Sequence, residues 1–202
     1  MNDRRPSANP IFQRCDRTAA YPYTIGEYGR RLLWEWVQAT LIRFSPRRAM
    51  GWRRLWLRLF GATVPRSSGV RPTTKVWHPW LLQMGEHSIL GDGVEVYNLG
   101  QVTLGDHTVV SQGAYLCAGT HDYTRADLPL QRPPITIGSG VWICAQAFIG
   151  PGVTVGDNSV VGARAVVVRN VEAGLVVGGN PATVIKPRPM GENDTKAEPV
   201  DG

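Results

Sequence analysis

Aliphatic residues recur every six positions along most of the chain. One block holds six of them in unbroken register, namely Ile137, Ile143, Ile149, Val155, Val161 and Val167. An earlier block keeps the spacing, with two residues inserted after its second member, at Leu90, Val96, Leu104, Val110 and Leu116. A weaker first round falls at Val70, Val76 and Leu82. The residue that follows each aliphatic is mostly glycine.

This period excludes an α-helix, because a period of 3.6 would scatter residues spaced by six over different faces. Short rungs that turn every six residues instead stack on one another and bury their aliphatic side chains in a continuous axial core. Glycine makes up 23 of the 202 residues, which fits corners that need a positive φ or leave no room for a Cβ. The sequence therefore predicts a mainly β solenoid.

The first 66 residues follow a different pattern. Residues 1–29 are polar and aromatic and predict an irregular arm. Helical spacing then appears in two short runs, Leu33-Val37-Leu41-Phe44 and, after Ser45-Pro46, Trp52-Leu55-Trp56-Leu59-Phe60. We expect three parts: an arm with basic amphipathic helices over residues 1–66, a β-helix over 67–190 and a disordered tail over 191–202.

The net charge of +6 is unevenly distributed. Residues 1–66 carry 13 arginines and four acidic residues, a net charge of +9, whereas the remainder is net −3. Residues 30–66 also hold four of the seven tryptophans. Two compatible interpretations stay open: peripheral contact of these helices with an anionic membrane, or coverage of the open end of the β-helix. Nucleic acid is not expected, because the repeat region is acidic on balance.

Cysteine usage and the N-terminus favour a cytoplasmic protein. Cys15, Cys117 and Cys144 show no CxxC spacing, which suits a reducing compartment. The N-terminal MNDRRPSANP has no apolar run of a secretory signal. The longest apolar stretch, residues 32–44, is too short and too polar to span a bilayer. We expect a cytoplasmic location, at most peripheral at the inner face of the membrane.

The repeat resembles that of the hexapeptide-repeat acyltransferases over about residues 70–190. The resemblance rests on the tract ITIGSGVWICAQAFIGPGVTVGDNSVVGARAVV and the closing GGNPATVIKP. Within that family, YNLGQVTLGD, GTHDY and the Arg/Trp-rich leader are similar to the acetyltransferases of colanic acid and exopolysaccharide biosynthesis. The resemblance implies a left-handed parallel β-helix and a homotrimer with active sites between subunits. It further implies acetyl-CoA as donor, no metal, and a sugar or glycolipid acceptor.

The repeat breaks once, at residues 119–134, where charged residues and prolines cannot fill a rung and predict an extruded loop. His121 lies where this loop leaves the coil. Transfer of an acetyl group to a hydroxyl needs a base, and histidine suits that role near neutral pH. The resemblance implies that His121 is this base. The sequence does not identify the group that orients its ring, although a backbone carbonyl would serve, and it assigns no oxyanion donor.

Further site residues are implied by the resemblance alone. Small side chains would line a groove for the pantetheine arm, and cations would meet the nucleotide phosphates; the implied donor contacts are Ala145, Ala163, Val168, Arg169, Thr183 and Lys186. Thr183 stands where arginine is common, and Cys144 where glycine is usual. Asn98 and Trp142 are candidates for the acceptor side, although an asparagine turn explains Asn98 nearly as well.

The sequence thus favours an O-acetyltransferase that acetylates a sugar hydroxyl of an exopolysaccharide precursor. One alternative keeps the enzyme and changes the acceptor to a free sugar, serine or a xenobiotic. A zinc hydratase like the γ-type carbonic anhydrases would use His87, His107 and His121, but the separation of fourteen between the last two is not a whole coil. A non-catalytic structural β-helix is the third alternative.

Overall fold

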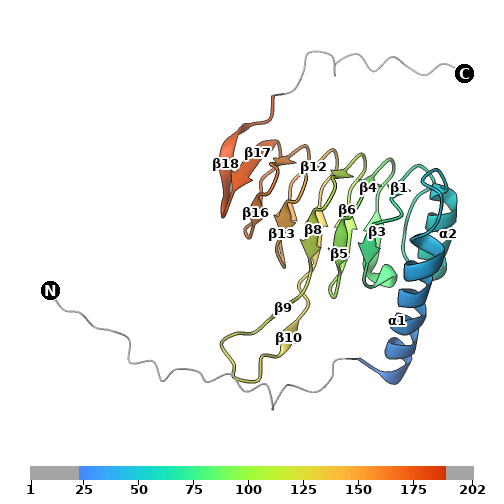
Figure 1. The fold of residues 1–202 in the computed structure, drawn as a ribbon. Helices are drawn as coiled ribbons and strands as arrows, with labels where there is room; N and C mark the ends of the chain where they lie inside the picture. The colour runs from blue at the N-terminus through green and yellow to red at the C-terminus, as the bar shows by residue number, and fades with distance from the viewer. Residues whose placement is uncertain (1–22, 190–202) are drawn as a thin grey trace, which may run out of the picture.

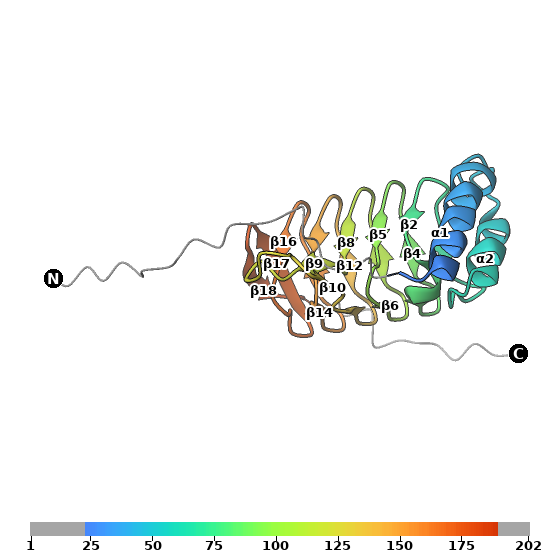
Figure 2. The same ribbon diagram turned by 90° about the horizontal axis from the view of Figure 1, so that it is seen from below.

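The computed structural model describes residues 23–189 (Figures 1 and 2), and the predicted tail over 191–202 lies outside the described residues. Three sheets wrap around a common axis to form a solenoid, with two helices at its N-terminal end and a hairpin that projects from its side. The predicted fold, a parallel β-helix with a short helical segment and an extruded loop, is confirmed.

Each coil contributes one short strand to each sheet. The first sheet contains β1 (Gly69–Val70), β4 (Ile89–Leu90), β7 (Val109–Val110), β12 (Trp142–Ile143), β15 (Val160–Val161) and β17 (Leu175–Gly179), with β18 (Ala182–Pro187) antiparallel at its end. The second contains β2 (Lys75–Val76), β5 (Glu95–Tyr97), β8 (Tyr115–Cys117), β13 (Phe148–Ile149) and β16 (Val166–Val167). The third contains β3 (Leu82–Met84), β6 (Val102–Leu104), β11 (Ile135–Ile137) and β14 (Thr154–Val155).

The strand register corrects the first round of the repeat. Met84 pairs with Leu104 and is buried, whereas Leu82 pairs with Val102. Met84, and not Leu82, therefore holds the repeat position. The early coils are 20 residues long, as in the pairing of Ile89 with Val109, and the later ones return to 18. The two-residue insertion seen in the sequence thus recurs in the first coil.

Two different constraints act at the corners. A Cβ on Gly105 would lie 2.5 Å from the backbone nitrogen of Ser139, so the neighbouring coil leaves room only for glycine. The left-handed backbone falls two residues later, at His107 with φ of 54°, and the equivalent His87 has φ of 56°. His107 is therefore a turn residue, as the sequence suggested.

Buried hydroxyls add a ladder along one corner. Ser68, Ser88 and Thr108 lie 20 residues apart, and each donates to a backbone carbonyl of the following coil. Ser88, for example, bonds to the carbonyl of Gly105 at 2.5 Å. These bonds satisfy hydroxyls that would be costly to bury unpaired. The small polar residues at the fourth repeat position therefore tie successive coils together.

The N-terminal segment forms α1 (Ile25–Val37), continues as the π-helix η2 (Gln38–Ile42) and returns as α2 (Met50–Leu59); a short 3₁₀ turn, η3 (Pro79–Leu81), precedes β3. The expected irregular arm over residues 1–29 is wrong for its last part, because a capping box of Thr24 and Glu27 starts the first helix at Ile25. The buried side of α1 carries Trp34 and Val37.

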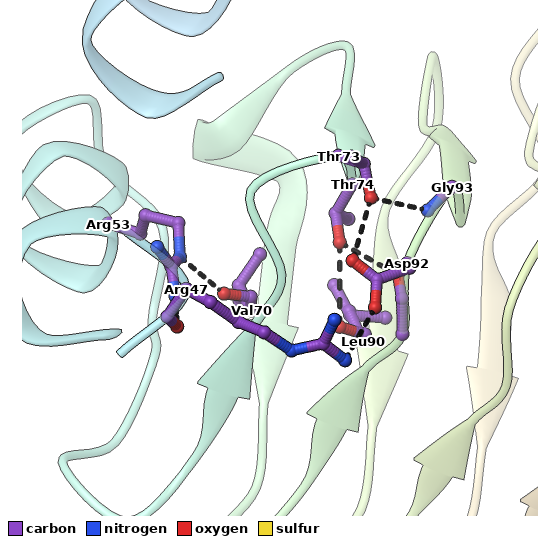
Figure 3. A network of polar contacts seen from close by, with 9 residues as sticks. Arg47, Arg53, Val70, Thr73, Thr74, Leu90, Asp92 and Gly93 are labelled. Carbon is purple, nitrogen blue, oxygen red and sulfur yellow. Dashed lines mark hydrogen bonds and ion pairs between the residues drawn. The ribbon is translucent and has the colours of Figure 1, made fainter. Parts of the chain in front are cut away.

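These helices close the open end of the solenoid. The indole of Trp34 donates to the carbonyl of Val76, and the amide of Val76 donates to Gln38. Arg53 is fully buried and donates to the carbonyl of Val70 at 2.6 Å (Figure 3). Side chains thus pair the strand edge of the first coil. The covering role, one of the two interpretations of the leader, is what these contacts describe.

Further arginines of the leader are also used in this way. Arg54 donates to the carbonyl of Ser68 and Arg58 to that of Val64. Arg47 forms an ion pair with Asp92 at 3.1 Å, and Asp92 also accepts from Thr73 (Figure 3). Much of the positive charge near the N-terminus therefore holds the helices on the first coils.

Candidate active site

The chain leaves the solenoid after β8 as an antiparallel hairpin of β9 (Thr120–His121) and β10 (Leu130–Gln131). It projects away from the coils at the corner between the second and third sheets (Figure 1). The returning strand passes so close to Gly100 that a Cβ there would collide with the carbonyl of Arg132. The hairpin root is thereby fixed against the preceding coil.

His121 lies exposed on this hairpin, and its ring is oriented by the backbone. The Nδ1 atom is 2.7 Å from the carbonyl oxygen of Leu128. Because a carbonyl can only accept, Nδ1 carries the hydrogen and Nε2 keeps its lone pair. Leu128 itself has φ of 42°, an uncommon left-handed conformation for leucine. The carbonyl of Leu128 is therefore the orienting partner that the sequence left unidentified.

The acidic residues of the hairpin serve the hairpin itself. Asp122 accepts from the hydroxyl and backbone N–H of Thr124, and these bonds lower the pKa of its carboxyl. Arg125 and Asp127 form a two-pronged ion pair with distances of 2.9 and 2.8 Å. Asp122, the neighbour of His121 in sequence, is thus used within the loop, and the printed bond of the His121 ring goes to the backbone.

The implied donor contacts lie at two corners of the chain. Ala145 and Ala163 stack at the corner between the first and second sheets, where the backbone N–H of Arg164 donates to the carbonyl of Ala145. Val168 and Arg169 follow β16 at the corner between the second and third sheets, the corner from which the His121 hairpin also leaves. The second sheet separates these two groups.

The remaining donor candidates, Thr183 and Lys186, are exposed on β18 at the C-terminal end. Trp142 is 48% exposed on the first sheet, and its indole donates to Ser111 at 2.9 Å. It therefore lies on a different face of the solenoid from the hairpin root. The structure does not bring Trp142 and His121 together within one chain.

Asn98 is fully buried, and both polar groups of its side chain are used. The amide nitrogen donates to the carbonyl of His78 at 2.6 Å, and the amide oxygen accepts from the backbone N–H of His78 at 2.9 Å. In this conformation Asn98 ties two coils together. Contact with an acceptor would require these bonds to break, and it stays a prediction.

Two cysteines lie near the candidate residues. Cys117 precedes the hairpin and Cys144 precedes Ala145. Burial raises the pKa of both thiols above the usual value. Because the thiolate is the nucleophilic form, neither cysteine is prepared to carry an acyl group.

The three histidines of the zinc alternative are not gathered in one chain. His87 and His107 stack at the corner between the third and first sheets, with ring centroids 4.8 Å apart. His121 lies on the hairpin at another corner. Within residues 23–189, no group of three or more His, Cys, Asp or Glu residues could hold a metal ion.

Comparison with known proteins agrees with this architecture. The family described as bacterial transferase hexapeptide (six repeats) matches residues 134–169. A protein of Escherichia coli (strain K12) named "Putative colanic acid biosynthesis acetyltransferase WcaF" is 44% identical over 156 residues, which cover 77% of this chain and 86% of that protein. The galactoside O-acetyltransferase of the same strain is 30% identical over 128 residues, covering 62% of this chain and 63% of that protein.

A solved structure extends the likeness to three dimensions. A galactoside acetyltransferase in complex with coenzyme A superposes with a TM-score of 0.76 at 25% identity, covering 90% of this chain and 93% of that one. The repeat, the solenoid and the sequence identity to a relative matched over most of its length point to the same group. The chain belongs to the hexapeptide-repeat acetyltransferases.

Proposed function

We propose that this acetyltransferase transfers the acetyl group of acetyl-CoA to a sugar hydroxyl, with His121 as the general base. The observation that carries the proposal is the orientation of the His121 ring. Its Nδ1 hydrogen is bound to the carbonyl of Leu128 at 2.7 Å, so Nε2 is a proton acceptor on an exposed hairpin. A neutral imidazole held in this tautomer is suited to deprotonate a hydroxyl.

The proposed reaction needs no covalent enzyme intermediate. Nε2 of His121 takes the hydroxyl proton while the acceptor oxygen attacks the thioester carbonyl. The C–S bond then breaks, the imidazolium returns the proton to the departing sulfur, and the products are an acetyl ester and free coenzyme A. The raised pKa of the Cys117 and Cys144 thiols supports direct transfer over a route through an acyl-cysteine.

The donor would lie in a groove completed by a second copy of the chain. The small residues Ala145 and Ala163 would admit the pantetheine arm, and the exposed cations Arg169 and Lys186 would meet phosphates. Ala145 and Arg169 lie at different corners of one solenoid. A homotrimer would bring the first corner of one subunit against the second corner of its neighbour. Val168, Thr183 and Trp142 are proposed as further contacts.

The proposed acceptor is an exopolysaccharide precursor. The relatives that support it are a colanic acid biosynthesis acetyltransferase by name and a galactoside O-acetyltransferase. The test is release of coenzyme A thiol from acetyl-CoA with a panel of nucleotide sugars, lipid-linked sugars, free galactosides and serine, with mass spectrometry of the products.

We expect acetyl esters on one class of sugar and none on serine. Acetylation of serine alone would overturn the sugar acceptor. Absence of acetyl transfer together with zinc-dependent hydration of CO₂ would overturn the reaction itself. Absence of acetyl-CoA binding would favour a structural role.

A further inference from the structure

The two N-terminal helices carry large apolar side chains on the side that points away from the solenoid. We call this surface the outer helical face and define it by Ile25, Leu32, Trp36, Phe44, Trp52, Leu55 and Leu59. Phe44 is 83% exposed, Leu32 67% and Trp36 58%. The opposite sides of the same helices, which carry Trp34 and Arg53, are fully buried. Both helices are therefore apolar outward as well as inward.

The face is contiguous across the two helices. The indole of Trp52 on α2 donates to the carbonyl of Leu41 on η2, and its ring lies edge-on to that of Trp56. Between the helices lies a hollow of about 500 Å³, lined by Thr40, Leu41, Phe44, Ser45, Pro46, Ala49 and Trp52. Apolar residues gathered in this way, and not scattered singly, mark a binding surface.

The rim of the face is positively charged. Arg43 and Arg48, in and beside the connection between the helices, are exposed, and neither has a hydrogen bond or ion pair among residues 23–189. The acidic residues between positions 23 and 85 are Glu27 and Glu35. Glu27 belongs to the capping box, and Glu35 lies 3.9 Å from Arg31. The free charge beside the apolar side chains is therefore cationic.

We propose that the outer helical face binds an anionic lipid surface, with its leucine and aromatic side chains inserted at headgroup level and Arg43 and Arg48 at the phosphates. Apolar residues with a cationic rim are the combination that holds amphipathic helices in a membrane interface. A second copy of the chain fits less well, because pairing two such faces would bring the arginines of both rims together. Among residues 23–189, no helix is long and apolar enough to cross a membrane.

This membrane proposal is independent of acetyl transfer. The helices stand at one end of the solenoid, and the His121 hairpin projects from its side (Figure 2). Several arginines that suggested membrane contact are already bound to the first coils, as Arg53 is to Val70. Binding is therefore assigned chiefly to the apolar side chains, with the free arginines adding affinity at low salt.

The test is sedimentation of the full chain with vesicles of phosphatidylcholine alone or mixed with phosphatidylglycerol. The decisive variant combines Leu32→Gln, Trp36→Gln and Phe44→Gln, all at exposed positions. The matched control is Ile185→Gln, whose side chain is 63% exposed on β18 at the other end of the solenoid. A variant with Arg43→Gln and Arg48→Gln separates the charge from the apolar contribution. Circular dichroism and light scattering accompany each variant.

We expect the wild type and Ile185→Gln to bind the mixed vesicles equally and the triple variant to bind at least about tenfold more weakly. The double arginine variant should lose binding mainly at low salt. If the triple variant does not fold, Phe44→Gln alone replaces it, because that side chain packs on little of the protein. Failure of the wild type to bind mixed vesicles, or undiminished binding by the apolar variants, would overturn the proposal. A change of assembly size without a change in vesicle binding would do so as well.

Discussion

At the scale of single residues, the sequence located the candidate base but not what orients it. The GTHDY motif at the break of the repeat points to His121. The partner of its Nδ1 is a backbone carbonyl seven residues later, at Leu128. No side-chain type marks such a carbonyl, and the left-handed φ of Leu128 has no glycine or asparagine to announce it. Asn98 shows the converse, because its side chain is used by His78.

The cysteines give a test at this scale. Replacing both Cys117 and Cys144 by alanine should leave kcat within about threefold of wild type, because burial keeps both thiols protonated and transfer does not pass through them. The measurement is thiol release under saturating acetyl-CoA, beside each single variant. Loss of activity in one single variant, together with a trapped acetylated cysteine in the wild type, would instead support a covalent route.

At the scale of elements, the apolar spacing predicted both helices but not their buried sides. Leu33 and Phe44 belong to the predicted stripe and are exposed, whereas Trp34 and Arg53 are buried. The inward positions are set by the strand edge of the first coil, which needs donors for its carbonyls. An arginine at that interface cannot be inferred from hydrophobic periodicity. The start of α1, in contrast, was legible in the T-x-x-E of its capping box.

Arg53 should be the costliest single residue of the helical cap. It donates to the carbonyls of Val70, Pro46 and Arg47 and to Ser45. Arg53→Met would leave these buried acceptors unpaired and should lower the free energy of unfolding by about 3 kcal/mol or more. Urea denaturation checks this, with the exposed Arg48→Met as control. Equal stability of the two variants would mean that water replaces the lost bonds.

The start of α1 should depend on pH. Hydrogen bonds from Thr24, the backbone N–H first and then the side chain, lower the pKa of Glu27. A carboxyl whose pKa is lower in the folded state adds stability above its unfolded value, about 4.3, and loses it as pH falls through the folded value. The difference in melting temperature between wild type and Glu27→Gln should therefore shrink below about pH 4. A difference constant down to pH 2.5 would contradict this.

At the scale of the whole molecule, the six-residue period predicted the solenoid, because stacking of equivalent rungs leaves few other ways to bury the repeated aliphatics. The coil length of 20 in the early part and the exchange of Leu82 for Met84 follow from an insertion that recurs there. Which site residues come together could not be read from the repeat. Ala145 and Arg169 lie at different corners of one chain.

This separation predicts complementation between inactive subunits. If a site joins the corner of His121 and Arg169 from one chain to the corner of Ala145 from another, mixed assemblies of His121→Ala and Ala145→Trp should regain part of the wild-type activity. Mixtures of His121→Ala and Arg169→Ala should not, because both changes damage the same corner. Thiol release after co-refolding at equal ratios measures this. Equal recovery by both mixtures, or by neither, would contradict a site shared between chains in this way.

The central claim is that His121 removes the acceptor proton. The most direct measurement compares kcat of wild type and His121→Ala with the acceptor found in the panel, alongside the Kd for acetyl-CoA by calorimetry. Loss of a general base should lower kcat by about 10²–10⁴-fold, with donor affinity and melting temperature close to wild type, since the side chain is exposed on the hairpin. Turnover by His121→Ala at the wild-type rate would contradict the account.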